Sequence, residues 1–217
     1  MLRLSGISIR NTLRGLDLTV GRDEFVLVIG ANGAGKTTLF NIISGAAIPA
    51  AGKIFFNDRD VTALPQHKRA KWISSVLQDP RQGTVAEMTI LENLALSYMR
   101  NSHKRITKST VELFKKKLSV LEMNLENRLS ERAGDLSGGQ RQALSLIMAT
   151  VADYDLLLLD EITSSLDQKN SLMVMRIAEK VVTTEKKACM LITHDANHIK
   201  YFNGRVLEMK NGALASC

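Results

Sequence analysis

The fold is decided by the stretch Glu24-Phe25-Val26-Leu27-Val28-Ile29-Gly30-Ala31-Asn32-Gly33-Ala34-Gly35-Lys36-Thr37-Thr38. Its first part is a near-continuous apolar run of strand length, and its second part fits the pattern of a phosphate-binding loop. Residues 36–44 then have helical character and end at Gly45, a common helix terminator. The stretch therefore predicts a buried strand, a glycine-rich loop and a helix, in the order that a phosphate-binding loop requires.

The residue types of this loop suit a triphosphate. Its glycines let the backbone curl so that successive N–H groups point at phosphate oxygens, and the start of the helix adds positive potential. Lys36 would reach the β- and γ-phosphates, and the hydroxyl of Thr37 would bind Mg²⁺. The predicted nucleotide-binding residues of the loop are Gly30, Ala31, Asn32, Gly33, Ala34, Gly35, Lys36, Thr37 and Thr38.

The length and composition are those of one globular domain. The chain has 217 residues, of which 45% are hydrophobic and 24% charged, which excludes a disordered chain or a disulfide scaffold. No apolar run approaches the roughly 18 residues of a membrane helix, and the first residues lack the features of a signal peptide. We therefore expect a cytosolic location. Cys189 lies in the apolar run 188–192 and is expected to be a core residue without chemistry.

The net charge of +7 is concentrated in one segment. Between Arg100 and Lys117 seven cations face the single carboxylate of Glu112, a local net charge of +6. Such a segment could contact nucleic acid or the anionic lipid of a membrane, or it could be a solvated helix face without a partner. The cations are Arg100, Lys104, Arg105, Lys108, Lys115, Lys116 and Lys117.

A second apolar run, 156–159, ends in two carboxylates, Asp160 and Glu161. A strand this apolar belongs inside a parallel sheet, so its carboxyl end should lie at the ligand-binding edge, beside the end of the strand that leads into the phosphate loop. Asp160 is suited to hold Mg²⁺ and Glu161 to activate an attacking water. Without the phosphate loop these two carboxylates would be read as solvated loop charges.

Leu136-Ser137-Gly138-Gly139-Gln140 is a further candidate anion site. Ser137 can cap the helix predicted over 140–152, and the glycines expose N–H groups at its start. Because one nucleotide does not need two such sites, the second one is best explained as serving a nucleotide held by another chain. This interpretation requires a dimer.

Strands that alternate with helices predict an α/β fold with a mostly parallel sheet covered on both faces. From about Pro80 to Asp135 the chain instead reads as a helical insert. We therefore predict a single domain over 1–217, in which 1–79 and 136–217 form the catalytic core and 80–135 a helical subdomain.

These motifs, in this order, resemble those of the nucleotide-binding subunit of ATP-binding cassette (ABC) transporters over essentially the whole chain. The phosphate loop matches the Walker A motif of that family, Ser137–Gln140 its signature motif, and Asp160 with Glu161 its Walker B motif and catalytic glutamate. Three further matches rest on the resemblance, namely Gln78 with the Q-loop, Asp167 with the D-loop and His194 with the switch histidine.

The resemblance implies a P-loop NTPase core with an antiparallel β part. It implies ATP and Mg²⁺ as cofactors, and a head-to-tail dimer in which Ser137, Gly138, Gly139 and Gln140 of one subunit close over ATP held by Lys36 of the other. Catalysis would then use Glu161, His194 and Lys36, and the metal would be held near Thr37, Gln78 and Asp160. The helical insert would contact an integral membrane permease, at the cytoplasmic face of the cell membrane.

Two features of the sequence bear on this resemblance. His194 and His198 have the spacing of a zinc pair, but Asp195 stands where a zinc protease has glutamate and no third ligand is evident, so we reject a zinc site. The family usually has an aromatic residue ahead of the Walker A motif on which adenine stacks, and the segment 9–12 has none. Arg10 is the candidate to stack on adenine instead, through its guanidinium plane.

The function predicted is an ATP hydrolase that drives a separate permease. The first hypothesis is import of small, amino-acid-like solutes, which would add a solute-binding protein as partner. The alternatives are an export or lipoprotein-releasing motor, and a non-transport ABC ATPase that acts on nucleic acid or ribosomes. Nucleic acid is not expected as a partner, because ABC ATPases that act on nucleic acid or ribosomes usually carry two cassettes or a long insertion, and this chain has neither.

Overall fold

The computed structural model describes residues 1–10, 12–100, 105–162, 168–193 and 204–216, and its largest element is a six-stranded sheet. The strand order is β10-β9-β3-β8-β7-β6, and all neighbours are parallel except the β10-β9 hairpin. The strands are β3 (Phe25–Ile29), β6 (Ile73–Val76), β7 (Leu156–Asp160), β8 (Ala188–Ile192), β9 (Arg205–Lys210) and β10 (Ala213–Ser216). The predicted mostly parallel sheet is confirmed.

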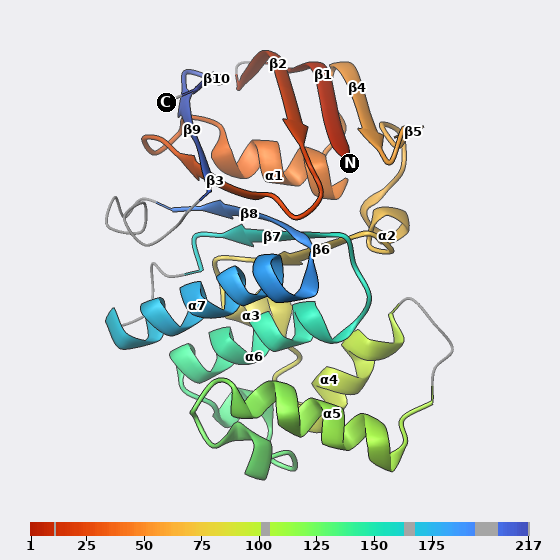
Figure 1. The fold of residues 1–217 in the computed structure, drawn as a ribbon, viewed down its shortest axis with the longest axis vertical. Coiled ribbons are helices and arrows are strands. Elements are labelled where there is room, and N and C mark those ends of the chain that lie inside the picture. Colours follow the sequence, from red (N-terminus) through yellow and green to blue (C-terminus); the bar gives the residue numbers. More distant parts are fainter. Residues whose placement is uncertain (11, 101–104, 163–167, 194–203, 217) are drawn as a thin grey trace.

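A separate antiparallel sheet of four strands has the order β2-β1-β4-β5. Its strands are β1 (Leu2–Ile9), β2 (Leu13–Val20), β4 (Ala51–Phe56) and β5 (Arg59–Asp60). Helix α1 (Lys36–Ser44) lies between the two sheets (Figure 1). One core cluster joins residues of both sheets to α1, as Leu4, Val28 and Leu39 do. The antiparallel sheet and α1 together therefore cover one face of the parallel sheet.

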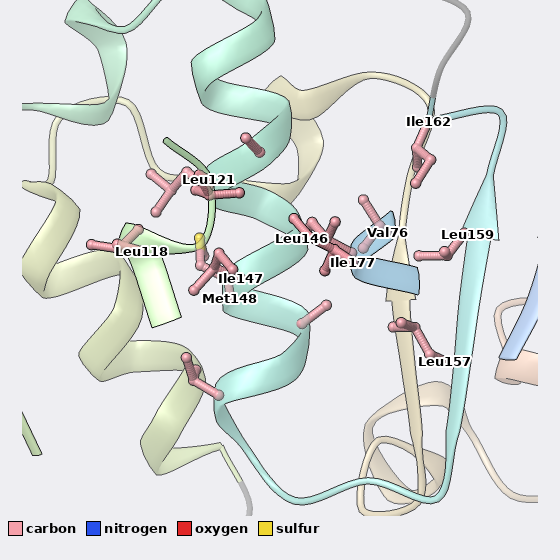
Figure 2. Packing of buried hydrophobic residues seen from close by; sticks show 14 of the residues in the cluster. Val76, Leu118, Leu121, Leu146, Ile147, Met148, Leu157, Leu159, Ile162 and Ile177 are labelled. Carbon is pink, nitrogen blue, oxygen red and sulfur yellow. The ribbon is translucent and has the colours of Figure 1, made fainter. Parts of the chain in front are cut away.

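The opposite face of the parallel sheet is covered by α6 (Gly138–Val151) and α7 (Gln168–Glu185) (Figure 1). Figure 2 shows Leu146 of α6 and Ile177 of α7 lying toward Val76 and Leu159 of the strands. Because strand side chains alternate between faces, Leu157 and Leu159 belong to this second core cluster while their neighbours in β7 belong to the first. Both faces of the central strands are thus buried, which explains their continuous apolar sequence.

The segment between β6 and α6 consists of helices. These are α3 (Pro80–Gly83), α4 (Ile90–Met99), α5 (Lys108–Ser119) and the short 3₁₀ helices η1 (Leu125–Asn127) and η2 (Ala133–Asp135), while α2 (Gln66–Arg69) precedes β6. Helices α4 and α5 pack against α6 on the side away from the sheet (Figure 1). Helix α6 is therefore surrounded, and each residue from Gln142 to Val151 is buried.

The start of one helix differs from the prediction. Helix α6 begins at Gly138, two residues before the predicted start, because the cap at Ser137 allows the glycines to join the first turn.

Candidate functional site

The phosphate loop connects β3 to α1 and depends on backbone conformations that favour glycine. Gly30, Gly33 and Gly35 all have positive φ, at 152°, 78° and 105°. A side chain at Gly30 would also collide with the backbone carbonyl of Met209 in β9. The loop is therefore shaped both by local conformation and by the neighbouring strand.

Lys36 is the first residue of α1 and is only 5% exposed. Its Nζ donates hydrogen bonds to the carbonyl oxygens of Gly30 at 2.8 Å and Ala31 at 3.0 Å, so the side chain folds back over the loop. Burial lowers the pKa of the Lys36 ammonium, while the charges of Glu161 and Asp160 act in the opposite direction. The lysine and both carboxylates are therefore near enough for their charges to interact.

The carboxylates Asp160 and Glu161 lie at the end of β7. Asp160 is the last residue of the strand and is 8% exposed, and Glu161 has a left-handed conformation with φ of 49°. The Glu161 N–H donates to the carbonyl oxygen of Ile192 in β8 at 3.1 Å. Glutamate rarely adopts a positive φ. At Glu161 this conformation turns the chain directly after β7 and sets the direction in which the residue leaves the sheet.

The strand order corrects one prediction. The end of β7 does not lie directly beside the end of β3, because β8 is inserted between them. The sequence could not give this order, since β8 is the last of the three along the chain. Thr193, after β8, donates its N–H to the carbonyl oxygen of Val28 in β3.

A cavity of about 540 Å³ brings together the three residues predicted for the metal, Thr37, Gln78 and Asp160. They come from α1, from the residues after β6 and from the end of β7. A hydroxyl, an amide oxygen and a carboxylate are oxygen donors of the kind that Mg²⁺ binds, so the residues fit the ion. No group of three or more histidine, cysteine or acidic side chains suited to a metal occurs in the described part of the chain.

Asn41 also lines this cavity and was not predicted. It lies four residues after Thr37 and therefore on the same face of α1. The spacing along the predicted helix was the signal that could have identified it.

The signature residues form the start of α6 and take no part in lining this cavity. The Ser137 hydroxyl accepts the Gln140 N–H at 3.3 Å, and the Gln140 side-chain oxygen accepts the Ser137 N–H at 3.1 Å. This reciprocal capping confirms Ser137 as the predicted N-cap. It also shows that Gln140 takes part in the cap, which the sequence analysis did not predict. Ser137 and Gly138 are exposed, which leaves the N-terminus of a 14-residue helix open to a partner.

The segment expected to bind adenine lies close to the phosphate loop. A side chain at Gly35 would come within 3.0 Å of the Leu13 side chain and 3.2 Å of the Thr12 carbonyl. Asn11 lies outside the described residues, as do Asp167, His194 and His198. The proximity of Thr12 is consistent with adenine binding at this segment.

Some of the cations in the basic segment are paired within the fold. Arg100 donates to the Ser74 hydroxyl at 3.3 Å, and burial lowers the pKa of its guanidinium. Lys115 pairs with Glu112 at 3.0 Å and Lys117 with Glu185 at 3.2 Å. Lys104 lies outside the described residues. Among the described cations of the segment, Arg100, Lys115 and Lys117 thus make contacts within the fold.

Cys189 is fully buried in β8, and burial raises the pKa of its thiol far above the usual range. The prediction of a core residue without chemistry agrees with this environment.

Comparison with known proteins agrees with this geometry. The family model of the ABC transporter matches residues 13–164. The chain is 35% identical over 208 residues to the tyrosine transport ATP-binding protein of Clostridioides difficile (strain R20291), which covers 94% of this chain and 83% of that protein. It is 31% identical over 205 residues to the lipoprotein-releasing system ATP-binding protein LolD of Psychrobacter arcticus (strain DSM 17307 / VKM B-2377 / 273-4), covering 92% of this chain and 88% of that one.

Solved cassettes share the fold. The dimeric structure of MJ0796, a bacterial ABC transporter cassette, matches with a TM-score of 0.86 at 23% identity and covers 99% of this chain and 96% of that chain. The chain therefore belongs to the ATP-binding cassettes of ABC transporters, and it is an ATP hydrolase of that family. Within the residues described, no helix has the length and apolar character needed to span a membrane.

Proposed function

We propose that this cassette binds Mg·ATP between two copies of the chain arranged head to tail and uses its hydrolysis to drive a membrane permease. The observation that carries the proposal is the separation of the two anion sites. Thr37, Gln78 and Asp160 line one cavity, whereas the capped start of α6 at Ser137 stands outside it and is exposed. Two separate sites that both suit a triphosphate are explained if each is completed by the other subunit.

The residues of one subunit would hold the nucleotide. The N–H groups of residues 30–38 and the start of α1 would bind the phosphates, and Lys36 would exchange its loop carbonyls for the β- and γ-phosphates. Thr37, Gln78 and Asp160 would hold Mg²⁺, which neutralises phosphate charge when bound. Arg10 would stack on the adenine.

Hydrolysis requires a base placed beside the γ-phosphate. Glu161 directly follows Asp160 and is only partly buried, so its carboxylate can accept a proton from an attacking water. His194 would donate a hydrogen bond to the γ-phosphate, and Asp167 would act at the subunit boundary. Ser137, Gly138, Gly139 and Gln140 of the second subunit would seal the site with N–H groups and a hydroxyl.

The permease is proposed to import a small, amino-acid-like solute with the help of a solute-binding protein. The support is the 35% identity to a protein named for tyrosine transport, compared with 31% to one named for lipoprotein release. The cassette would then work at the cytoplasmic face of the cell membrane. Co-purification with a permease whose transport stimulates ATP hydrolysis would test this, and stimulation by a lipoprotein substrate instead would favour the release motor.

A mixing experiment tests the composite site. Lys36→Ala damages the phosphate loop, and Ser137→Glu places a carboxylate where the partner's triphosphate would lie. Each variant alone should hydrolyse ATP poorly. An equimolar mixture contains dimers with one intact site, formed by Lys36 of one subunit and Ser137 of the other, so activity should reappear. A mixture no more active than its components would contradict the head-to-tail arrangement.

A further inference from the structure

The segment from Leu77 to Thr84 carries Gln78 out of β6, through α3 and into the helical part of the chain. We propose that Arg141 and Gln142 of α6 are positioning residues that clamp the two ends of this segment and thereby set Gln78 relative to Thr37 and Asp160. This inference rests on the proposed function in that it takes Gln78 to serve the Mg·ATP site.

The first end of the segment is held by Gln142. Its side-chain Nε2 donates to the carbonyl oxygen of Leu77, the residue directly before Gln78, at 3.3 Å. Gln142 is 1% exposed, so its amide lies in the interior, where a polar group is costly unless it bonds. A methionine or leucine would fill the same space at lower cost. The Nε2 therefore has its partner in the backbone carbonyl that it holds, whereas the Oε1 is buried without a hydrogen-bond partner among the described residues.

The second end is held by Arg141. Its Nε donates to the hydroxyl of Thr84, and one terminal nitrogen donates to the Thr84 carbonyl oxygen at 3.4 Å. Thr84 is 7% exposed, and its hydroxyl in turn donates to the carbonyl oxygen of Pro80 at 3.0 Å. The guanidinium thus holds one residue through two acceptors from two different nitrogens, in a planar fork that a lysine ammonium does not reproduce.

The close packing of α3 on α6 leaves little room for α3 to move independently of α6. A Cβ at Gly83 would collide with the hydroxyl of Ser145, so α3 lies against the next turn of α6. Figure 1 shows α3 beside α6, in agreement with their direct contacts. Arg141, Gln142 and Ser145 fall on neighbouring positions of one helix face.

The segment between the two ends contains the capped helix α3. The Asp79 carboxylate accepts the backbone N–H of Arg81 at 3.0 Å and pairs with its guanidinium at 2.9 Å, which caps α3. A displacement of Gln78 would therefore be passed to Arg141 and Gln142, in the turn that directly follows Ser137–Gln140. The clamp connects the cavity of a subunit to the motif that the same subunit offers to its partner.

Kinetics and ATP affinity of the full chain test the clamp. Arg141→Ala and Gln142→Met should each lower kcat roughly tenfold or more, the scale of a group displaced by part of an ångström. The dissociation constant for ATP should change less than about twofold, because the loop at residues 30–38 supplies most phosphate contacts. In a Gln78→Ala background neither variant should lower kcat further, since the residue that they position is then missing.

Amide hydrogen exchange gives a readout without nucleotide. In the free chain, Arg141→Ala should increase exchange over residues 77–84 and leave residues 30–38 unchanged. Arg141→Lys should restore part of the protection and of kcat, and Thr84→Ser should retain both, while Thr84→Val should behave like Arg141→Ala. These mild substitutions keep the test available if Arg141→Ala fails to fold.

Arg128→Ala is the matched control. Arg128 also makes two hydrogen bonds from its guanidinium, to Glu131 at 2.8 and 2.6 Å, but away from the cavity. Its loss should leave kcat unchanged. The proposal is overturned if the Arg141 and Gln142 variants lower kcat equally with and without Gln78, or if they leave exchange of residues 77–84 unaltered. Failure of the proposed function would look different, because wild-type hydrolysis would then not depend on Gln78 at all.

Discussion

Glu161 is the residue on which turnover should depend most. It leaves β7 in a left-handed conformation, next to the buried Asp160 and near Lys36. Glu161→Gln keeps the size and hydrogen-bonding capacity of the side chain but removes the base. We expect ATP affinity to be retained and turnover to fall by at least roughly 10²-fold. Phosphate release at saturating ATP measures this, and hydrolysis at the wild-type rate would remove Glu161 from its role.

Lys36 should matter for binding rather than for chemistry alone. Lys36→Ala removes a charged donor from the phosphates and also the contacts to Gly30 and Ala31 that shape the loop. We expect the binding free energy of ATP to weaken by about 1.5–3 kcal/mol, the range of a charge-assisted hydrogen bond. Equilibrium binding of a fluorescent ATP analogue measures the change. An unchanged dissociation constant would contradict the assigned contact.

At the scale of elements, α1 is fixed at both of its ends. Its start forms part of the phosphate loop, and its last turn is held by Arg69, which is fully buried. The Arg69 guanidinium donates to the carbonyl oxygens of Ile42 at 2.7 Å and Ile43 at 3.0 Å. It also bonds the carbonyls of Thr62 and Leu64, which precede α2. A cation at a helix C-terminus is favourable, and the negative charge of Asp60 also acts on this guanidinium.

Arg69→Ala should therefore destabilise the whole fold. Four carbonyl groups, two of them in buried hydrogen bonds, would lose the donor that Arg69 supplies, and we expect the free energy of unfolding to fall by about 3 kcal/mol. Arg69→Lys should recover only part of this, because an ammonium cannot reach the same set of acceptors. Urea unfolding followed by Trp72 fluorescence measures both. Lys68→Ala, at the exposed neighbouring position, is the control and should be nearly neutral.

At the scale of the whole molecule, the exposed start of α6 makes nucleotide and dimerisation interdependent. The Glu161→Gln chain should elute at about twice its 24.0 kDa mass when ATP and Mg²⁺ are present. It should return to the monomer position when EDTA removes the metal, because phosphate repulsion is then no longer neutralised. Size exclusion with light scattering measures the mass. A chain that remains monomeric while it hydrolyses ATP fully would contradict the composite site.

The sequence alone determined the local units of this protein. The loop at 30–38, the helix that follows it and the buried strands around Leu27 and Leu158 could all be predicted, because glycine conformation, capping and apolar periodicity act over a few residues. The same local chemistry predicted Ser137 as a helix cap and gave Asp160 and Glu161 their place at the end of a strand.

Only the tertiary structure decided which of these units meet. The insertion of β8 between β3 and β7, the cavity shared by Thr37 and Gln78, and the bond from Arg141 to Thr84 all join segments far apart in the chain. Such contacts depend on strand order and on how helices pack on the sheet, which no short stretch of sequence specifies. The candidate functional residues could therefore be predicted one by one from the sequence, whereas their arrangement in one site depends on the tertiary packing.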